Sequence, residues 1–184
     1  MNSVAVFCGS RDGNSSDFLR AATELGEAIA EKNLRLVYGG SRTGLMGTVA
    51  NAALSNGVEV VGVLPRSLAD KERAHPGLTE LHLVESLAER KQIMADEADA
   101  FLALPGGFGT LDEVFEMITW TQLGVQRKAT GFVNTGGFFD HLMASIYLQV
   151  DAGFIPQEQL DAIVIDATPA EALDQLVAAA SRIS

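Results

Sequence analysis

Two neighbouring carboxylates, Asp112 and Glu113, follow a cluster of glycines in residues 102–113, LALPGGFGTLDE. The apolar run before Pro105 predicts a buried strand, and the apolar period after the glycines predicts a helix. A glycine-rich turn between a strand and a helix directs backbone N–H groups and the positive end of the helix dipole to one point, where phosphate commonly binds. Residues 106–109 therefore predict an anion site beside two acidic side chains.

The spacing of Thr110 and Glu113 also fits a capping box. In that motif Thr110 is the N-cap of the helix, and the glutamate three residues later accepts a hydrogen bond from the N–H of the cap residue. The spacing alone favours this structural role for Glu113. A catalytic role for the carboxylate stays open.

Two cations interrupt the apolar side of another predicted helix. The helix after Ser86 has an apolar stripe that includes Leu87 and Met94, and Arg90 and Lys91 lie between them. One interpretation is that a cation packs its apolar stem on the core and extends its charge into water. The other is that an arginine lies at the ligand edge of the sheet and binds a carboxylate or phosphate through two parallel hydrogen bonds. The residues alone favour neither interpretation.

Short apolar strands alternate with helices along the whole chain, which predicts one α/β domain over residues 1–184. Its mostly parallel sheet would be doubly wound, with helices on both faces. The expected strands are 4–8, 34–38, 58–64, 81–84, 100–104, 130–134 and 162–165, and the expected helices include 17–32, 87–97, 111–123, 138–152 and one from 169.

Three glycine-containing turns follow predicted strands, at Gly9-Ser10, at residues 39–44 and at residues 106–109. Because the carboxyl ends of parallel strands share one edge of the sheet, the turns should lie close together, and this favours a ligand of nucleotide size. A dinucleotide is disfavoured, because the first turn lacks the G-x-G-x-x-G spacing.

The composition limits the possible functions. A formal net charge of −11 argues against binding to polymeric nucleic acid, which requires a basic surface. One cysteine, Cys8, and three scattered histidines suggest neither a disulfide framework nor a metal site, and Cys8 is expected to pack in the core. No apolar run is long enough to span a membrane and no basic leader precedes the first strand, so a cytoplasmic location is expected.

Three motifs together resemble the LOG ("lonely guy") family: GG-x-x-x-GLMG at 39–47, RK-x-x-M at 90–94 and PGG-x-GT-x-x-E at 105–113. The likeness continues through ITW-x-QLG at 118–124 and GGFF at 136–139, so it covers nearly the whole chain. Two positions depart from the common pattern, with Ser41 in place of a glycine and Leu87 in place of a methionine.

This resemblance implies a Rossmann-like homodimer that hydrolyses the N-glycosidic bond of a nucleoside 5′-monophosphate and needs no cofactor. The substrate would be a cytokinin riboside 5′-monophosphate, AMP or both, and the products the free base and ribose 5-phosphate. Arg90 and Glu113 match the family's catalytic pair. The nucleotide site expected from the motifs and turns comprises Gly9, Ser10, Glu72, Arg90, Lys91, Gly106, Gly107, Phe108, Gly109, Thr110, Leu111, Asp112, Glu113 and Thr119.

The chemistry suits the residue types. Cleavage of a ribosyl–base bond builds positive charge on the ribose, which a carboxylate can stabilise while it orients or deprotonates water. The arginine is too basic to be a convenient proton donor, which favours an electrostatic role.

Two alternatives have different requirements. Family members are often mislabelled lysine decarboxylases, and such an enzyme would need a Schiff-base lysine for pyridoxal phosphate among Lys32, Lys71, Lys91 and Lys128. The second alternative is a nucleotide-binding or carrier protein of the same fold without turnover.

Overall fold

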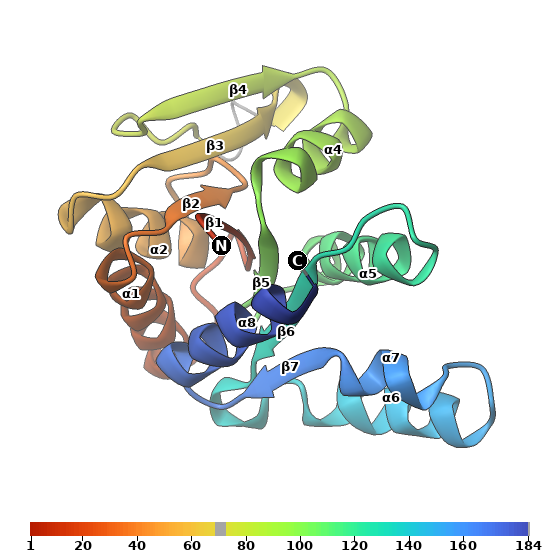
Figure 1. The fold of residues 1–184 in the computed structure, drawn as a ribbon. Helices are drawn as coiled ribbons and strands as arrows, with labels where there is room; N and C mark the ends of the chain where they lie inside the picture. The colour runs from red at the N-terminus through yellow and green to blue at the C-terminus, as the bar shows by residue number, and fades with distance from the viewer. Residues whose placement is uncertain (69–72, 184) are drawn as a thin grey trace.

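A parallel seven-stranded sheet forms the centre of the computed structural model, which describes residues 1–68 and 73–183 (Figure 1). The chain winds outward from β1 to β4, returns to the other side of β1 with β5, and then winds outward to β7. This arrangement confirms the doubly wound α/β prediction. In their order across the sheet the strands are β4 (Glu80–Val84), β3 (Val60–Pro65), β2 (Arg35–Tyr38), β1 (Ser3–Phe7), β5 (Ala100–Ala103), β6 (Ala129–Val133) and β7 (Ile163–Asp166).

Helices cover both faces of the sheet (Figure 1). Most lie where the apolar periods predict them, and α4 has the predicted bounds. One face carries α1 (Ser16–Glu31), α2 (Gly44–Ser55) and α8 (Pro169–Ile183), and the other carries α4 (Leu87–Glu97), α5 (Phe108–Gln122), α6 (Asp140–Asp151) and α7 (Gln157–Asp161). The short α7 was not predicted. The helix expected from residue 138 begins at Asp140, and a 3₁₀ turn, η1 (Thr135–Gly137), precedes it.

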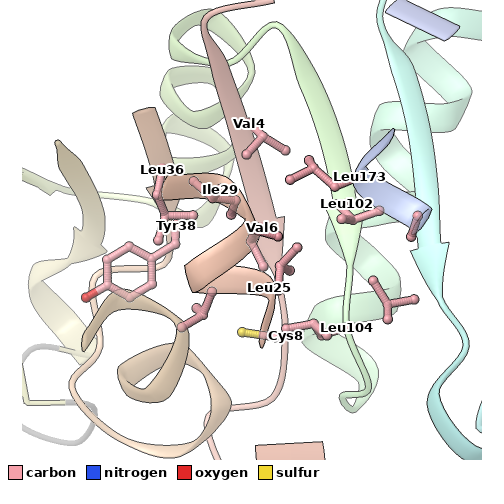
Figure 2. Close-up of a cluster of buried hydrophobic side chains, with 14 of the residues drawn as sticks. Val4, Val6, Cys8, Leu25, Ile29, Leu36, Tyr38, Leu102, Leu104 and Leu173 are labelled. Carbon is pink, nitrogen blue, oxygen red and sulfur yellow. The ribbon is translucent and has the colours of Figure 1, made fainter. Parts of the chain in front are cut away.

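The core has two layers because successive side chains of a strand point to opposite faces of the sheet. Figure 2 shows the layer on the α1 side, where Val4 and Val6 of β1 lie beside Leu25 of α1 and Leu173 of α8. The intervening side chains, such as Phe7, pack in the second layer against α4 and α5. Both faces of the central strands are therefore buried, which explains their continuous apolar runs.

The sheet reverses its winding direction between β1 and β5. These strands are paired, with Phe7 opposite Ala103, but the loops beyond them lead to helices on opposite faces, α1 and α5. The two loops also touch, because the N–H of Gly9 donates to the carbonyl of Pro105 at 3.1 Å. A crevice opens at such a reversal, and open α/β sheets bind their ligands there.

Among the described residues, no helix combines the length and the apolar composition needed to cross a lipid bilayer.

Candidate active site

A cavity of about 500 Å³ lies at the carboxyl ends of β1 and β5, at the reversal point of the sheet. It brings together two of the three predicted glycine turns, and residues of α2 and α4 complete its wall. The lining residues are Cys8, Gly9, Ser10, Arg11, Asp12, Gly13, Phe18, Leu45, Met46, Arg90, Pro105, Gly106, Gly107, Phe108, Gly109, Thr110, Glu113 and Phe138.

Helix α5 begins three residues before the predicted position. Gly107 is its N-cap and makes no capping hydrogen bond through a side chain, and the N–H of Leu111 donates to the carbonyl of Gly107 at 3.1 Å. Thr110 is therefore the third helical residue and not the cap, so the predicted capping box with Glu113 is wrong. Because glycine has a low helix propensity, the sequence pattern assigned the first turn of the helix to the preceding loop.

The start of α5 has the geometry of an anion site. The first N–H groups of a helix have no partner within it, and here they belong to residues that line the cavity. Apart from the adjoining residues and the backbone of α5 itself, a Cβ atom on Gly107 or Gly109 would meet no protein atom within 4 Å, so the packing of the protein does not require these glycines. Because these glycines have no side chains, phosphate oxygens can approach the backbone closely.

Arg90 and Glu113 form a buried ion pair in the cavity wall, with 3.1 Å between Nη1 and Oε1. The two residues are only 7% and 8% exposed. Arg90 also donates through Nε to the carbonyl of Val63 at 2.9 Å and through Nη2 to the carbonyl of Gly39 at 3.2 Å. The arginine that interrupts the apolar stripe of α4 thus lies at the ligand edge of the sheet.

Lys91 points away from the cavity. Its ammonium group pairs with Asp112 at 2.9 Å and with Glu116. Burial lowers the pKa of Lys91, but the hydrogen bonds to Glu116 and Asp112 outweigh burial and raise the pKa above its usual value. The apolar stripe was expected to place Leu87 on the buried side of α4. In the structure Leu87 is 54% exposed, and Arg90 is buried instead.

The structure does not bring every predicted site residue to the cavity. Leu111, Asp112 and Lys91 lie just outside it, and Thr119 is exposed two turns further along α5, where its hydroxyl donates to the carbonyl of Phe115. Glu72 lies outside the described residues.

An aromatic wall of the cavity was not predicted. Phe138 is 43% exposed and packs edge-to-face on Phe18, with 5.5 Å between the ring centroids. Gly136 and Gly137, both with positive φ, turn the chain after β6 and bring Phe138 to this place. The GGFF motif was the available sequence signal, but neither its composition nor its position indicated a cavity wall.

Cys8 lines the floor of the cavity as well as packing in the core. Burial raises the pKa of its thiol, the nearby Glu113 raises the pKa further, and Arg90 opposes this effect. The thiol is therefore neutral and not a nucleophile.

Comparison with known proteins agrees with this geometry. A family model described as "possible lysine decarboxylase" matches residues 46–176. The chain is 46% identical over 164 residues to a cytokinin riboside 5′-monophosphate phosphoribohydrolase of Rhodococcoides fascians. The aligned region covers 89% of this chain and 83% of that protein. It is 44% identical to the enzyme of that name from Oryza sativa subsp. japonica, over 91% of this chain and 69% of that protein. The chain belongs to the LOG family.

The fold of this LOG family member also occurs in more distant proteins. A molybdenum cofactor binding protein from Rippkaea orientalis superimposes with a TM-score of 0.71 at 18% identity, over 100% of this chain and 99% of that one. The molybdenum cofactor carrier protein of Chlamydomonas reinhardtii gives a TM-score of 0.70 at 21% identity, over 97% and 99% of the two chains. At these identities the likeness concerns the fold alone.

The description of the family model as a possible lysine decarboxylase does not fit the described residues of this site. Among the described residues, none of the cavity-lining side chains is a lysine. Lys91, the nearest candidate in the motifs, is held by two carboxylates that raise its pKa, whereas formation of a Schiff base requires a neutral amine. In the part of the chain that the structure describes, no lysine is placed to attach pyridoxal phosphate in the cavity, and Lys71 lies outside the described residues.

Proposed function

We propose that this chain hydrolyses the N-glycosidic bond of a nucleoside 5′-monophosphate and releases the free base and ribose 5-phosphate. The substrate is a cytokinin riboside 5′-monophosphate, AMP or both. One observation carries the proposal: the buried Arg90–Glu113 pair and the open start of α5 line the same cavity, in a chain of the LOG family. The curated relatives are named as enzymes of this class.

The first turn of α5 binds the 5′-phosphate. Its unpartnered N–H groups and the helix dipole favour a dianion, and Gly107 and Gly109 allow the phosphate oxygens to reach the backbone. In a protein with a formal net charge of −11, this local site provides attraction that the surface as a whole does not.

Glu113 acts on the ribose. As the bond from C1′ to the base nitrogen breaks, its electron pair leaves with the base and positive charge develops on the sugar. The carboxylate stabilises that charge and accepts a proton from the water whose oxygen bonds to C1′, while the departing base gains a proton. The burial of Glu113 strengthens these interactions, because the charge of its carboxylate is poorly screened inside the cavity.

We also propose that the protein is a homodimer, as the resemblance implies. Large apolar side chains are exposed beyond the end of α5 and on α6, among them Leu123, Val125 and Leu148 at 68–70% exposure. Thr119 is on the exposed side of α5 and makes no contribution to the cavity of its own chain. In a dimer that covers this surface, Thr119 would approach the partner subunit.

The decisive experiment is incubation of the purified protein with AMP and, separately, with isopentenyladenosine 5′-monophosphate. Free base and ribose 5-phosphate are measured by chromatography, and nucleotide binding is measured in parallel by calorimetry. We expect equal amounts of the two products. Tight binding without any release of base would refute the hydrolase and support the carrier alternative.

A further inference from the structure

Two main-chain carbonyls fix the position of Arg90 in the cavity wall. Val63 lies in β3 and Gly39 directly follows β2, so the guanidinium group is attached to the ends of two neighbouring strands. Its remaining terminal nitrogen, Nη1, contacts Glu113. The position of the carboxylate thus depends on how closely the guanidinium group can approach the sheet.

Gly39 makes this close approach possible. A Cβ atom on Gly39 would lie 2.1 Å from Nη2 and 3.3 Å from Cζ of Arg90, so the guanidinium group occupies the space of a side chain at position 39. The neighbouring Gly40 and Gly44 are needed for a different reason, because both have positive φ. The φ of Gly39 lies outside that range, so no left-handed backbone conformation requires a glycine at this position.

We infer that Gly39 is a positioning residue for the Arg90–Glu113 pair. The inference rests on the proposed function, in which Glu113 acts on the ribose. Gly39 does not line the cavity, so it acts through Arg90 and not on the substrate. This role is separate from the phosphate-binding role of the glycines at the start of α5.

A methyl group at position 39 should damage the site more than the fold. The atoms nearest to it would be the ends of two flexible side chains, Nη2 of Arg90 and, at 2.6 Å, Sδ of Met46. These ends can move without a shift of the backbone. Arg90 would then lose its bond to the carbonyl of Gly39 and its alignment with Glu113, and a displacement of about 1 Å in a catalytic group typically lowers the rate about 100-fold.

The test is the variant Gly39→Ala in the full chain, with Gly26→Ala as the matched control. Gly26 is a buried glycine of α1 whose added Cβ would lie 2.6 Å from the carbonyl oxygen of Val49, and neither residue lines the cavity. We expect Gly39→Ala to lower kcat about 100-fold with little change in KM for AMP. Gly26→Ala should lower Tm and keep kcat. A kcat for Gly39→Ala within threefold of the wild-type value would overturn the inference.

A double variant separates action through Arg90 from a general disturbance. Lysine has no Nη2 atom, so in an Arg90→Lys background the methyl group has no guanidinium to displace. We expect Gly39→Ala/Arg90→Lys to turn over AMP at the rate of Arg90→Lys alone. A further large loss in the double variant would refute the inference. If Gly39→Ala fails to fold, the double variant should still fold. A double variant that also fails to fold would refute the inference.

The crystal structure of Gly39→Ala provides a readout that is independent of turnover. We expect the contact between Nη1 of Arg90 and Oε1 of Glu113 to be broken, and an unchanged distance of 3.1 Å would overturn the inference. If the wild-type protein releases no base, the proposed function fails, but this structural comparison still decides the role of Gly39.

Discussion

The two charges of the Arg90–Glu113 pair are buried, since Arg90 is only 7% exposed and Glu113 only 8% exposed. Removal of charges from water is costly, and a buried ion pair often adds little to stability compared with apolar residues of the same size. Stability therefore gives a weak reason to keep this pair in the cavity wall. A role in the reaction is a stronger reason, since a poorly screened carboxylate stabilises a developing positive charge effectively.

We predict that Glu113→Gln folds but turns over AMP at least about 100-fold more slowly than the wild-type protein. Glutamine keeps a hydrogen-bonding oxygen for Arg90 but lacks the negative charge that stabilises the ribosyl cation and takes the proton. The lost charge also leaves the guanidinium partly uncompensated, at a cost of about 1–3 kcal/mol in the free energy of unfolding. Steady-state kinetics and thermal unfolding check both values.

The control for this substitution is Glu24→Gln, which removes a charge from an exposed ion pair of α1 with Arg20. It should change neither kcat nor Tm, because exposed pairs contribute little. If Glu113→Gln retains wild-type turnover, Glu113 has no catalytic role and the mechanism proposed above fails.

At the residue scale, the sequence indicated which types of side chain matter but not which of two neighbours carries the chemistry. Arg90 and Lys91 were equivalent in the pattern, because the rotation of α4 about its axis depends on how the helix packs on the sheet. The structure exposes Leu87 and buries Arg90, which no local propensity predicts. The same limit applies to Glu113, whose spacing from Thr110 fitted a cap until the true start of the helix was known.

At the scale of elements, the N-terminus of α5 makes the phosphate the group that contributes most to substrate binding. We predict that AMP is hydrolysed with a kcat/KM at least about 100-fold higher than adenosine, since two hydrogen bonds to a charged group are together worth about 3 kcal/mol or more. Competition between the two substrates in one reaction measures the ratio directly. Equal rates would contradict the assignment of the phosphate site.

A single methyl group in the first turn of α5 should separate stability from binding. We predict that Gly109→Ala raises the free energy of unfolding by about 0.5–1 kcal/mol, because alanine is favoured over glycine within a helix and the added Cβ meets no protein atom outside its own helix. The same Cβ blocks a backbone N–H, so the affinity for AMP should fall about tenfold or more. Calorimetry measures the affinity, and denaturant unfolding measures the stability. Unchanged affinity would show that the phosphate binds elsewhere.

The glycines that open the start of α5 to phosphate also made this start difficult to predict from the sequence. The sequence predicted a loop from Gly106 to Gly109 because glycine disfavours helices. In the structure Phe108 and Gly109 are already helical, supported by the rest of α5. Packing of the later turns, with Val114 and Met117 fully buried, outweighs the local preference.

At the scale of the whole molecule, the alternation of short apolar strands and helices was sufficient to predict the class of sheet and the edge that carries the site. The walls of the cavity were less accessible to prediction. Phe18 and Phe138 are about 120 positions apart in the sequence. They meet only because the loop after β6 reaches α1, and no pattern within either segment reports that contact.

We predict that light scattering will give a molar mass of twice the 19.5 kDa of one chain. The exposed apolar side chains beyond α5 and on α6 are the proposed contact surface. Leu123→Asp should lower the mass to that of a single chain, because an unpaired charge in such a contact is costly. A wild-type mass of 19.5 kDa at working concentration would refute the dimer.

The place of β1 between β2 and β5 has a consequence for biosynthesis. A ribosome releases β1 to β4 with their helices before it makes β5, so for that interval the central strand, with mostly apolar side chains, has an edge of unpaired backbone N–H and C=O groups. Arg90 also emerges ahead of Glu113, and a compact first half would bury a cation without its counter-charge. Both features favour late consolidation of the nascent chain, after α5 has left the exit tunnel, and make the half-made protein a ready client for chaperones.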